Sequence, residues 1–403
     1  MKKTKKSALI LSFSFVLIAT LLFSLPSYDK IAYADDQKDK RVSEETITDT
    51  VDELLEKTDL TSYEEFIKNL GLSTENYSVK ELVKQVLNND FSYDFKYVVS
   101  YVINVFFGNM KNLLVQAVII LITVVLMSIL SNLTTGFSRA STKKIVYLAC
   151  YGTIITVIGV MVGDAIISAG KMINDTGKFC DVVFPTLLSL VTAIGASASA
   201  AVYQPMVLIF ASYVVKIVNY VVMPAFFISF VFNVVGNMSD DIKLGKIAGF
   251  AKSCGEWIVG IAFGVFVTYT TASGITGAGI DSLATKGAKY ALSGYVPVIG
   301  GYLKDGFDII TAGCIVIKNA IGLVSVVLLL LFAAIPIMKI FATTIVLKLT
   351  GAIAEPFGEK KISDMLHNVG KSMTLPLITC VTVVFSILIV IMLIILTCNR
   401  GVI

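Results

Sequence analysis

Ionisable side chains inside apolar segments are the residues of this sequence with the most evident chemical potential. Asp164 lies in the run GVMVGDAIISAG, and Lys216 lies in a later apolar run from 206 to 235. Burying such a group in a membrane is costly unless it is paired or hydrated, so each residue marks a functional hypothesis. Three roles are open for Asp164: it sets the outer end of a span, lines a path for ions or solutes, or pairs with a cation such as Lys216.

Other catalytic or metal-binding patterns are missing from the sequence. The six cysteines show no Cys-x-x-Cys spacing, and His367 is the only histidine. This leaves little material for a zinc or redox site. No nucleophile–base set, phosphate-binding loop or carboxylate pair stands out either. The sequence therefore predicts a protein that is not an enzyme and has no cofactor and no metal.

The composition indicates a membrane protein with one acidic segment. The chain is 56% hydrophobic and 15% charged, with a mean hydropathy of +0.81, whereas soluble domains carry roughly 25% charged residues. Residues 35–96 hold sixteen acids and eight bases, a net charge of −8, which leaves thirteen of the 29 acids for the other residues. The net charge of +4 gives no reason to expect nucleic-acid binding. We expect a small acidic domain at 35–96 and a large apolar one at 97–403.

The first 34 residues have the pattern of a signal peptide. MKKTKK is followed by the apolar run SALILSFSFVLIATLLFSL and then by AYA, in which Ala32 and Ala34 precede Asp35. Small residues at these two positions favour cleavage between Ala34 and Asp35. The alternative is an uncleaved first span, since the apolar run is long for a signal peptide. Either way, residues 35–96 are expected outside the cytoplasm.

Capping signals predict that the exported segment is helical. Three stretches fit the capping box, in which a Ser or Thr side chain and a Glu three residues later satisfy each other's backbone amides. They are TVDE (50–53), SYEE (62–65) and SVKE (78–81).

The remainder predicts an all-α polytopic membrane protein, because about 20 apolar residues cross a hydrocarbon core of about 30 Å. Candidate spans, about seven, are 113–131, 145–169, 183–203, 206–235, 257–279, 319–338 and 374–397. Arg139, Lys143 and Lys144 follow the first span without an acid, which places that loop in the cytoplasm. Seven spans would end the chain in the cytoplasm as well.

A run of small residues, SLVTAIGASASAAVYQP (189–205), stands between Pro185 and Pro205. Gly195 and Ser199 have the spacing that lets two membrane helices approach closely. The alternative is a helix break that lines a cavity or pore, to which Ser197 would also contribute.

A repeat and a polar segment bear on the same choice. A single constant offset aligns Pro185 and Pro224 with Pro297 and Pro336, as in transporters built from repeated halves. The corresponding segment 296–319 is polar enough to be either a loop with an amphipathic helix or a re-entrant segment.

Two connectors, at 240–255 and 359–372, place lysines at helical spacing among apolar residues. Helices that lie in the membrane interface with extended Lys side chains explain them. A basic patch that binds lipid or a partner is the alternative.

Several short motifs in fixed order resemble the stage III sporulation protein AE family of endospore-forming bacteria. They are NNDFS (88–92), GASASAAVYQPMVLIF (195–210), VVMPAFF (221–227), VPVIGG (296–301), IKNAIG (317–322) and AIPIMKI (334–340). The resemblance covers essentially the whole chain and supplies no catalytic residues. It implies a multi-pass protein of the mother-cell membrane around the forespore, with its N-terminal domain in the intermembrane space.

The same resemblance implies a function in the channel between mother cell and forespore, which supports forespore development and late sigma factor G activity. The implied partners are other membrane proteins of that channel complex, besides membrane lipid, and self-association is open. The alternative function is a secondary transporter or permease for a small solute.

Overall fold

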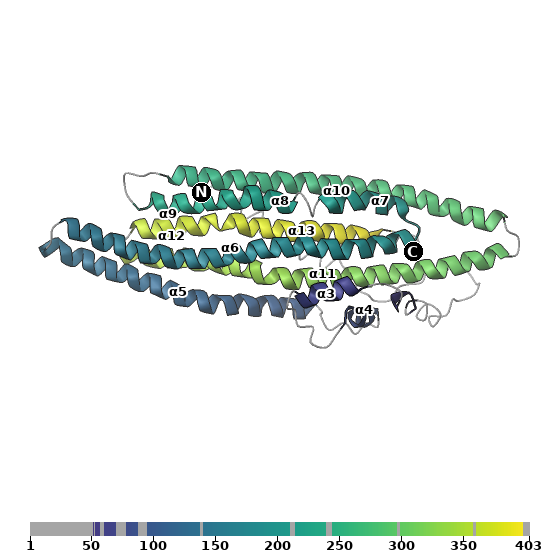
Figure 1. The fold of residues 1–403 in the computed structure, drawn as a ribbon, viewed down its shortest axis with the longest axis horizontal. Helices are drawn as coiled ribbons and strands as arrows, with labels where there is room; N and C mark the ends of the chain where they lie inside the picture. Colours follow the sequence, from purple (N-terminus) through teal and green to yellow (C-terminus); the bar gives the residue numbers. More distant parts are fainter. Residues whose placement is uncertain are drawn as a thin grey trace.

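The computed structural model describes ten ranges of the chain. They are residues 51, 53–56, 60–69, 78–87, 95–137, 140–209, 214–238, 244–295, 299–357 and 360–397. The signal-peptide prediction, with Ala32, Ala34 and Asp35, lies outside them. All elements in these ranges are helical, and they form a long bundle of helices that run side by side (Figure 1).

Four long helices make the frame of the bundle. They are α5 (Phe95–Phe137), α6 (Ala140–Ala193), α10 (Gly245–Tyr295) and α11 (Ile299–Ala354). α6 has 54 residues, which is about 80 Å at 1.5 Å per residue, whereas the hydrocarbon core of a bilayer is about 30 Å thick. These helices therefore extend well beyond the membrane that the bundle crosses.

Shorter helices complete the bundle. α7 (Ser197–Ile209), α8 (Val215–Ile217), the π-helix η2 (Val218–Val222) and α9 (Met223–Gly236) follow α6, and η3 (Glu355–Phe357), α12 (Lys360–Ser372) and α13 (Thr374–Leu396) follow α11. Within the predicted span at 206–235 the structure describes the end of α7 and then α8, the π-helical turn η2 and α9, which follow one another directly, whereas residues 210–213 lie outside the described ranges. π-helical turns often mark functional positions in helices.

Six helical segments in the described residues are long and apolar enough to cross a membrane, which confirms the all-α polytopic fold that was predicted with about seven spans. The predicted span at 183–203 is wrong. Its first half continues α6, because the polar stretch KMINDTGKFCD (171–181) that separated it from 145–169 is itself helical. Polar side chains do not interrupt a helix where it leaves the lipid.

With six crossings, the two ends of the membrane bundle face the same side. α13 runs toward the end of the bundle at which α3 (Thr61–Asn69) and α4 (Val79–Leu87) pack (Figure 1). Six crossings would therefore end the chain on the same side as its N-terminal domain, whereas the seven expected spans would end it on the opposite side.

The structure also bears on the predictions for the segment 296–319 and for the repeat. From Ile299 onward this segment is the first part of α11, so it forms neither a loop nor a re-entrant segment. Pro224 lies in the first turn of α9, whereas Pro336 lies inside α11. Both prolines thus stand within continuous helical stretches, and Pro297 lies outside the described residues, so the repeat stays a prediction.

The N-terminal helices α3 and α4 are packed on the bundle. At α4 the predicted capping box is confirmed: the Glu81 amide donates to Ser78 Oγ at 3.2 Å, and the Ser78 amide donates to Glu81 Oε2 at 2.8 Å. At α3 the predicted box is wrong, since the helix begins at Thr61 and the Tyr63 and Glu64 amides donate to the Leu60 carbonyl.

Aromatic residues fasten α3 to α6 and α11. The Phe66 ring lies 5.7 Å from that of Phe179 and 6.2 Å from that of Phe332. The Tyr63 hydroxyl is hydrogen-bonded to Ser325 Oγ on α11. Burial raises the pKa of Tyr63 above its ordinary value, so the phenol stays protonated. The N-terminal helices thereby pack on α6 and α11.

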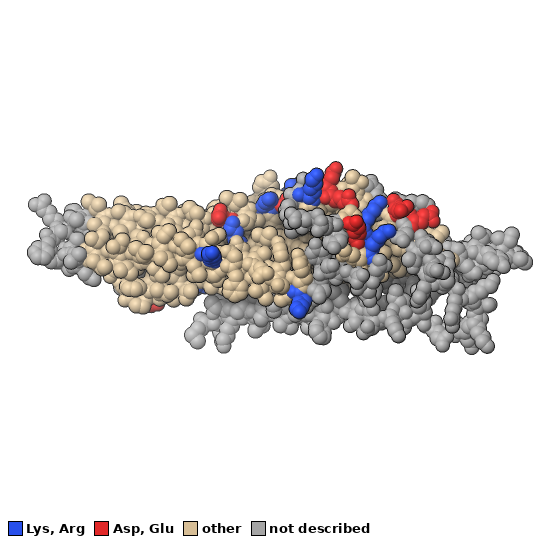
Figure 2. Space-filling model, turned by 90° about the horizontal axis from the view of Figure 1, so that it is seen from below, with Lys and Arg blue, Asp and Glu red and all other residues tan. Residues whose placement is uncertain are grey.

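The charge distribution separates the face that meets lipid from the face that meets water. Charged side chains gather over α3 and α4, whereas much of the remaining described surface in this view is uncharged (Figure 2). On α5, Phe107 is 65% exposed and Val115 is 61% exposed. An apolar outer surface of this kind fits lipid contact. Among the six crossing segments α11 is the most buried, so it is the central helix of the bundle.

Candidate functional site

The run of small residues contains a reversal of the chain at Gly195. Gly195 has φ +90°, the Ala196 amide donates to the Val191 carbonyl at 3.1 Å, and the Gly195 amide donates to the Thr192 carbonyl at 2.9 Å. This is a Schellman motif, which ends a helix with a left-handed residue that is usually glycine. α6 therefore stops here, and α7 returns along it as a helical hairpin.

Asp281 of α10 closes the first turn of α7. Its carboxylate accepts hydrogen bonds from the Ala198 amide at 3.0 Å and from the Ser199 amide at 2.8 Å, and the residue is only 3% exposed. The first amides of a helix have no partner within the helix, and an acidic group beside them is stabilised by the helix dipole. A buried charge from a distant helix thus takes the place of a local cap.

Close packing of α7 against α10 occurs at Ser199. Ser199 is fully buried. A Cβ added to Gly277 of α10 would lie 2.9 Å from Ser199 Oγ and 3.0 Å from Ser199 Cα, so only glycine fits there without a shift. The close packing predicted for Gly195 and Ser199 therefore occurs at Ser199 and not at Gly195, where α6 ends and an added Cβ would meet no atom within 4 Å.

A second buried charge holds the far end of α13. Lys318 of α11 is fully buried, and its ammonium donates to the Ile395 carbonyl at 2.9 Å and to the Thr397 carbonyl. The Tyr203 hydroxyl of α7 is 2.9 Å from Thr397 Oγ1. A cation at the C-terminus of a helix is favourable for the same reason as an anion at the N-terminus.

Neither Asp281 nor Lys318 is among the site residues that the sequence predicts. Lys318 could have been found from the sequence, because it is one cation in the apolar run CIVIKNAIG. Asp164 was selected for the same reason, as an ionisable residue in an apolar segment. Asp281 follows GITGAGI and has no comparable signal, because its role depends on where α7 begins.

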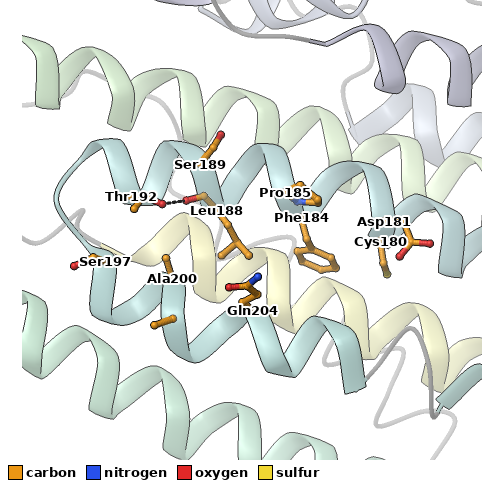
Figure 3. Close-up of a pocket in the computed structure, with 11 residues that line it drawn as sticks. Cys180, Asp181, Phe184, Pro185, Leu188, Ser189, Thr192, Ser197, Ala200 and Gln204 are labelled. Carbon is orange, nitrogen blue, oxygen red and sulfur yellow. Dashed lines mark hydrogen bonds between the residues drawn. The ribbon is translucent and has the colours of Figure 1, made fainter.

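A groove of about 480 Å³ lies between α6 and α7 (Figure 3). Its lining consists of Cys180, Asp181, Phe184, Pro185, Leu188, Ser189 and Thr192 of α6 with Ser197, Ala200, Ala201 and Gln204 of α7. Phe184 and Gln204 point into the space between the helices (Figure 3). Ser197 belongs to this groove, whereas Ser199 faces α10. The side chains that line the groove are mostly small and largely uncharged, so the groove is better suited to binding another molecule than to acid–base chemistry.

Asp164 and Lys216 do not meet. Asp164 Oδ2 lies 3.4 Å from Lys339 Nζ of α11, and that ammonium also donates to Ser168 Oγ at 3.2 Å. The Asp164 side chain is 67% exposed. The predicted pairing of Asp164 with Lys216 is therefore wrong, and Lys216 lies exposed in α8. Among the described residues, no group of three or more His, Cys, Asp or Glu side chains could hold a metal ion.

Comparison with known proteins places the chain among sporulation proteins. The family model described as stage III sporulation protein AE matches residues 77–398. A relative, stage III sporulation protein AE of Bacillus subtilis (strain 168), is 25% identical over 244 residues, which are 60% of this chain and 61% of the relative. The matched part thus spans about three fifths of that relative. No solved structure matches the chain.

Proposed function

We propose that this chain, which belongs to the stage III sporulation protein AE family, is a membrane component of the channel complex that joins the mother cell to the engulfed forespore. In this proposal the mother-cell membrane around the forespore holds the bundle, and α3, α4 and the α6–α7 hairpin lie in the intermembrane space. Its partners are other membrane proteins of the same complex, and its loss stops forespore development and late sigma factor G activity.

The observation that carries the proposal is the length of the bundle beyond the membrane. α6 and α11, with 54 and 56 residues, are each about 80 Å long, so more than half of each helix lies outside a hydrocarbon core of about 30 Å. The polar stretch 171–181 of α6 supports a position for the α6–α7 hairpin beyond the lipid. A helical projection of this size is well suited to assembly with proteins that stand between two membranes.

The surface of the hairpin supports a protein partner over lipid. Its exposed residues in the groove include Ser189, Thr192, Ser197 and Gln204. The exposed residues of α5 are instead large and apolar, such as Val115 and Ile122. Small and polar side chains permit close approach and hydrogen bonding by another helix, whereas they gain little from contact with lipid. We assign the groove to contact with a neighbouring protein of the complex. In this function the chain catalyses no reaction.

A secondary transporter is the second candidate, and the π-helical turn η2 within the helical segment Val215–Gly236 favours it. Transporters often bind substrate at interrupted membrane helices. A transporter works without the other proteins of a complex, and its binding site usually contains charged partners near the middle of the membrane. The exposed positions of Asp164 and Lys216 give little support to such a site.

Purification from sporulating cells tests the proposal. The full chain with an affinity tag, as the sole copy in the cell, is extracted in mild detergent and its associated proteins are identified. We expect other sporulation membrane proteins to be recovered in fixed ratio with it. Recovery of the chain alone, together with solute uptake by the purified protein in vesicles, would favour the transporter.

A further inference from the structure

A group of basic side chains lies at the end of the bundle opposite α3 and α4. Lys252 of α10, Lys348 of α11 and Lys371 of α12 come from three helices that each pack against α13. We propose that these three lysines form a binding site for a phosphate group, supplied by the headgroup of an anionic phospholipid. This inference does not depend on the proposed channel function.

Helix contacts bring the three lysines together. A Cβ added to Gly370 would lie 3.0 Å from Lys348 Cγ, so Lys348 runs along the turn of α12 that carries Lys371. Lys252 Nζ lies 3.2 Å from Glu256 Oε1, and Thr374 Oγ1 is 3.4 Å from the same oxygen. Thr374 follows Lys371 by one turn, and this contact fixes α10 beside the junction of α12 and α13.

The charges in this group are not balanced by the acids around them. The positive charges of Lys252 and Lys371 both act on Lys348. Within the described part of the chain, Glu256 pairs with Lys252, and neither Lys348 nor Lys371 forms an ion pair. Asp364 and Glu355 lie near His367, and the charges of Lys348 and Lys371 act on His367 as well. Like charges held close together repel one another unless an anion joins them.

The level of the cluster along the bundle fits a lipid headgroup. Trp257, the only tryptophan, is 71% exposed just over one turn beyond Lys252 on α10, and Phe250 on the same helix is 70% exposed. Exposed tryptophan and lysine are typical of the membrane–water interface. At this level the lysines can hold a headgroup phosphate while the acyl chains extend along the lipid-facing side of the bundle.

Lysine clusters between membrane helices bind anionic headgroups at this level. Each ammonium group is a compact positive charge that can donate three hydrogen bonds. Three such groups can therefore surround the oxygens of one phosphate. Inorganic phosphate offers the same oxygens without acyl chains. The two sources are therefore distinguished by experiment.

Thermal unfolding of the full chain in detergent tests the site. The midpoint is measured with phosphatidylglycerol, with phosphatidylcholine and with inorganic phosphate, each at the same concentration. We compare the parent with the double variant Lys348→Gln/Lys371→Gln. The control is Lys171→Gln/Lys216→Gln, which removes the same charge at two exposed positions outside the cluster.

We expect phosphatidylglycerol to raise the midpoint of the parent and the control by several degrees, and the cluster variant to lose most of this rise. Native mass spectrometry should show at least one fewer retained phosphatidylglycerol on the cluster variant. An equal rise with inorganic phosphate would support the phosphate site and identify free phosphate as its source. An equal response of the cluster variant and the parent, or no response to either anion, would overturn the proposal. If the double variant does not fold, the single exposed variant Lys371→Gln provides the same comparison.

Discussion

The Asp281 carboxylate of α10 accepts a hydrogen bond from the Ser199 amide at 2.8 Å, across 82 residues of sequence. This contact ties the beginning of α7 to α10, and Gly277, one turn earlier on α10, lets the two helices approach. The α6–α7 hairpin is therefore held from outside, by a neighbouring helix, as well as by its own turn.

Removal of the Asp281 carboxylate should destabilise the protein. Asp281→Ala leaves the buried amides of α7 without an acceptor and should lower the free energy of unfolding by about 2 to 4 kcal/mol, since each unpaired buried donor costs about 1–3 kcal/mol. Asp281→Asn keeps one acceptor oxygen and should lose less. Thermal unfolding in detergent, with limited proteolysis near residue 196, measures both effects. Equal stability of Asp281→Ala and the parent would show that this contact does not hold α7.

The left-handed conformation of Gly195 predicts a position-specific effect of alanine. Gly195→Ala should destabilise by about 1–2 kcal/mol, because a side chain is unfavourable at this backbone conformation. Gly159 in the interior of α6 is the matched control, since a Cβ there meets nothing within 4 Å. Gly159→Ala should be neutral or should stabilise by up to about 1 kcal/mol through helix propensity. Comparable unfolding midpoints for the two variants would contradict the turn at Gly195.

Close packing at Ser199 predicts a difference between two glycines of α10. Gly277→Ala places a Cβ within 2.9 Å of Ser199 Oγ, whereas a Cβ on Gly260 meets nothing within 4 Å. The first change should lower the yield of folded protein through overpacking, at a cost of about 1–3 kcal/mol, and the second should not. Yield after extraction and the unfolding midpoint report this difference. A tolerated Gly277→Ala would mean that α7 and α10 are separated more widely.

Local patterns predicted the parts of this structure that local interactions determine. The capping box at Ser78 and Glu81 depends only on a short stretch of sequence, so it could be predicted. The apolar spans could also be predicted, except where α6 continues through 171–181. A sequence pattern cannot show that this polar stretch stays helical beyond the lipid.

The contacts between distant helices were not predictable in the same way. The partner of Asp164 is Lys339, which lies on a different helix far along the chain, and the acceptors of Lys318 are carbonyl oxygens, which every residue carries. Asp281 has a function only once α7 begins at Ser197. Each of these contacts depends on how two helices are aligned, and no local sequence pattern determines that alignment.

The exposed pair of Asp164 and Lys339 predicts a small effect. Asp164→Asn should change the free energy of unfolding by about 0–1 kcal/mol, as is usual for exposed ion pairs. Protein level and a forespore reporter of late gene expression, measured together in sporulating cells, should both stay normal. A normal protein level with a silent reporter would instead give Asp164 a direct function in conduction.

Crosslinking from the groove tests most directly whether the hairpin contacts a partner. A photoreactive amino acid replaces Gln204, which lines the groove, and in a matched strain it replaces Leu126, which is exposed on α5. Both strains are irradiated during sporulation, after each variant has been shown to support spore formation. We predict an adduct between position 204 and another sporulation membrane protein, and no such adduct from position 126. Absence of any protein adduct from position 204 in cells that form spores normally would contradict the assignment of the groove to a protein partner.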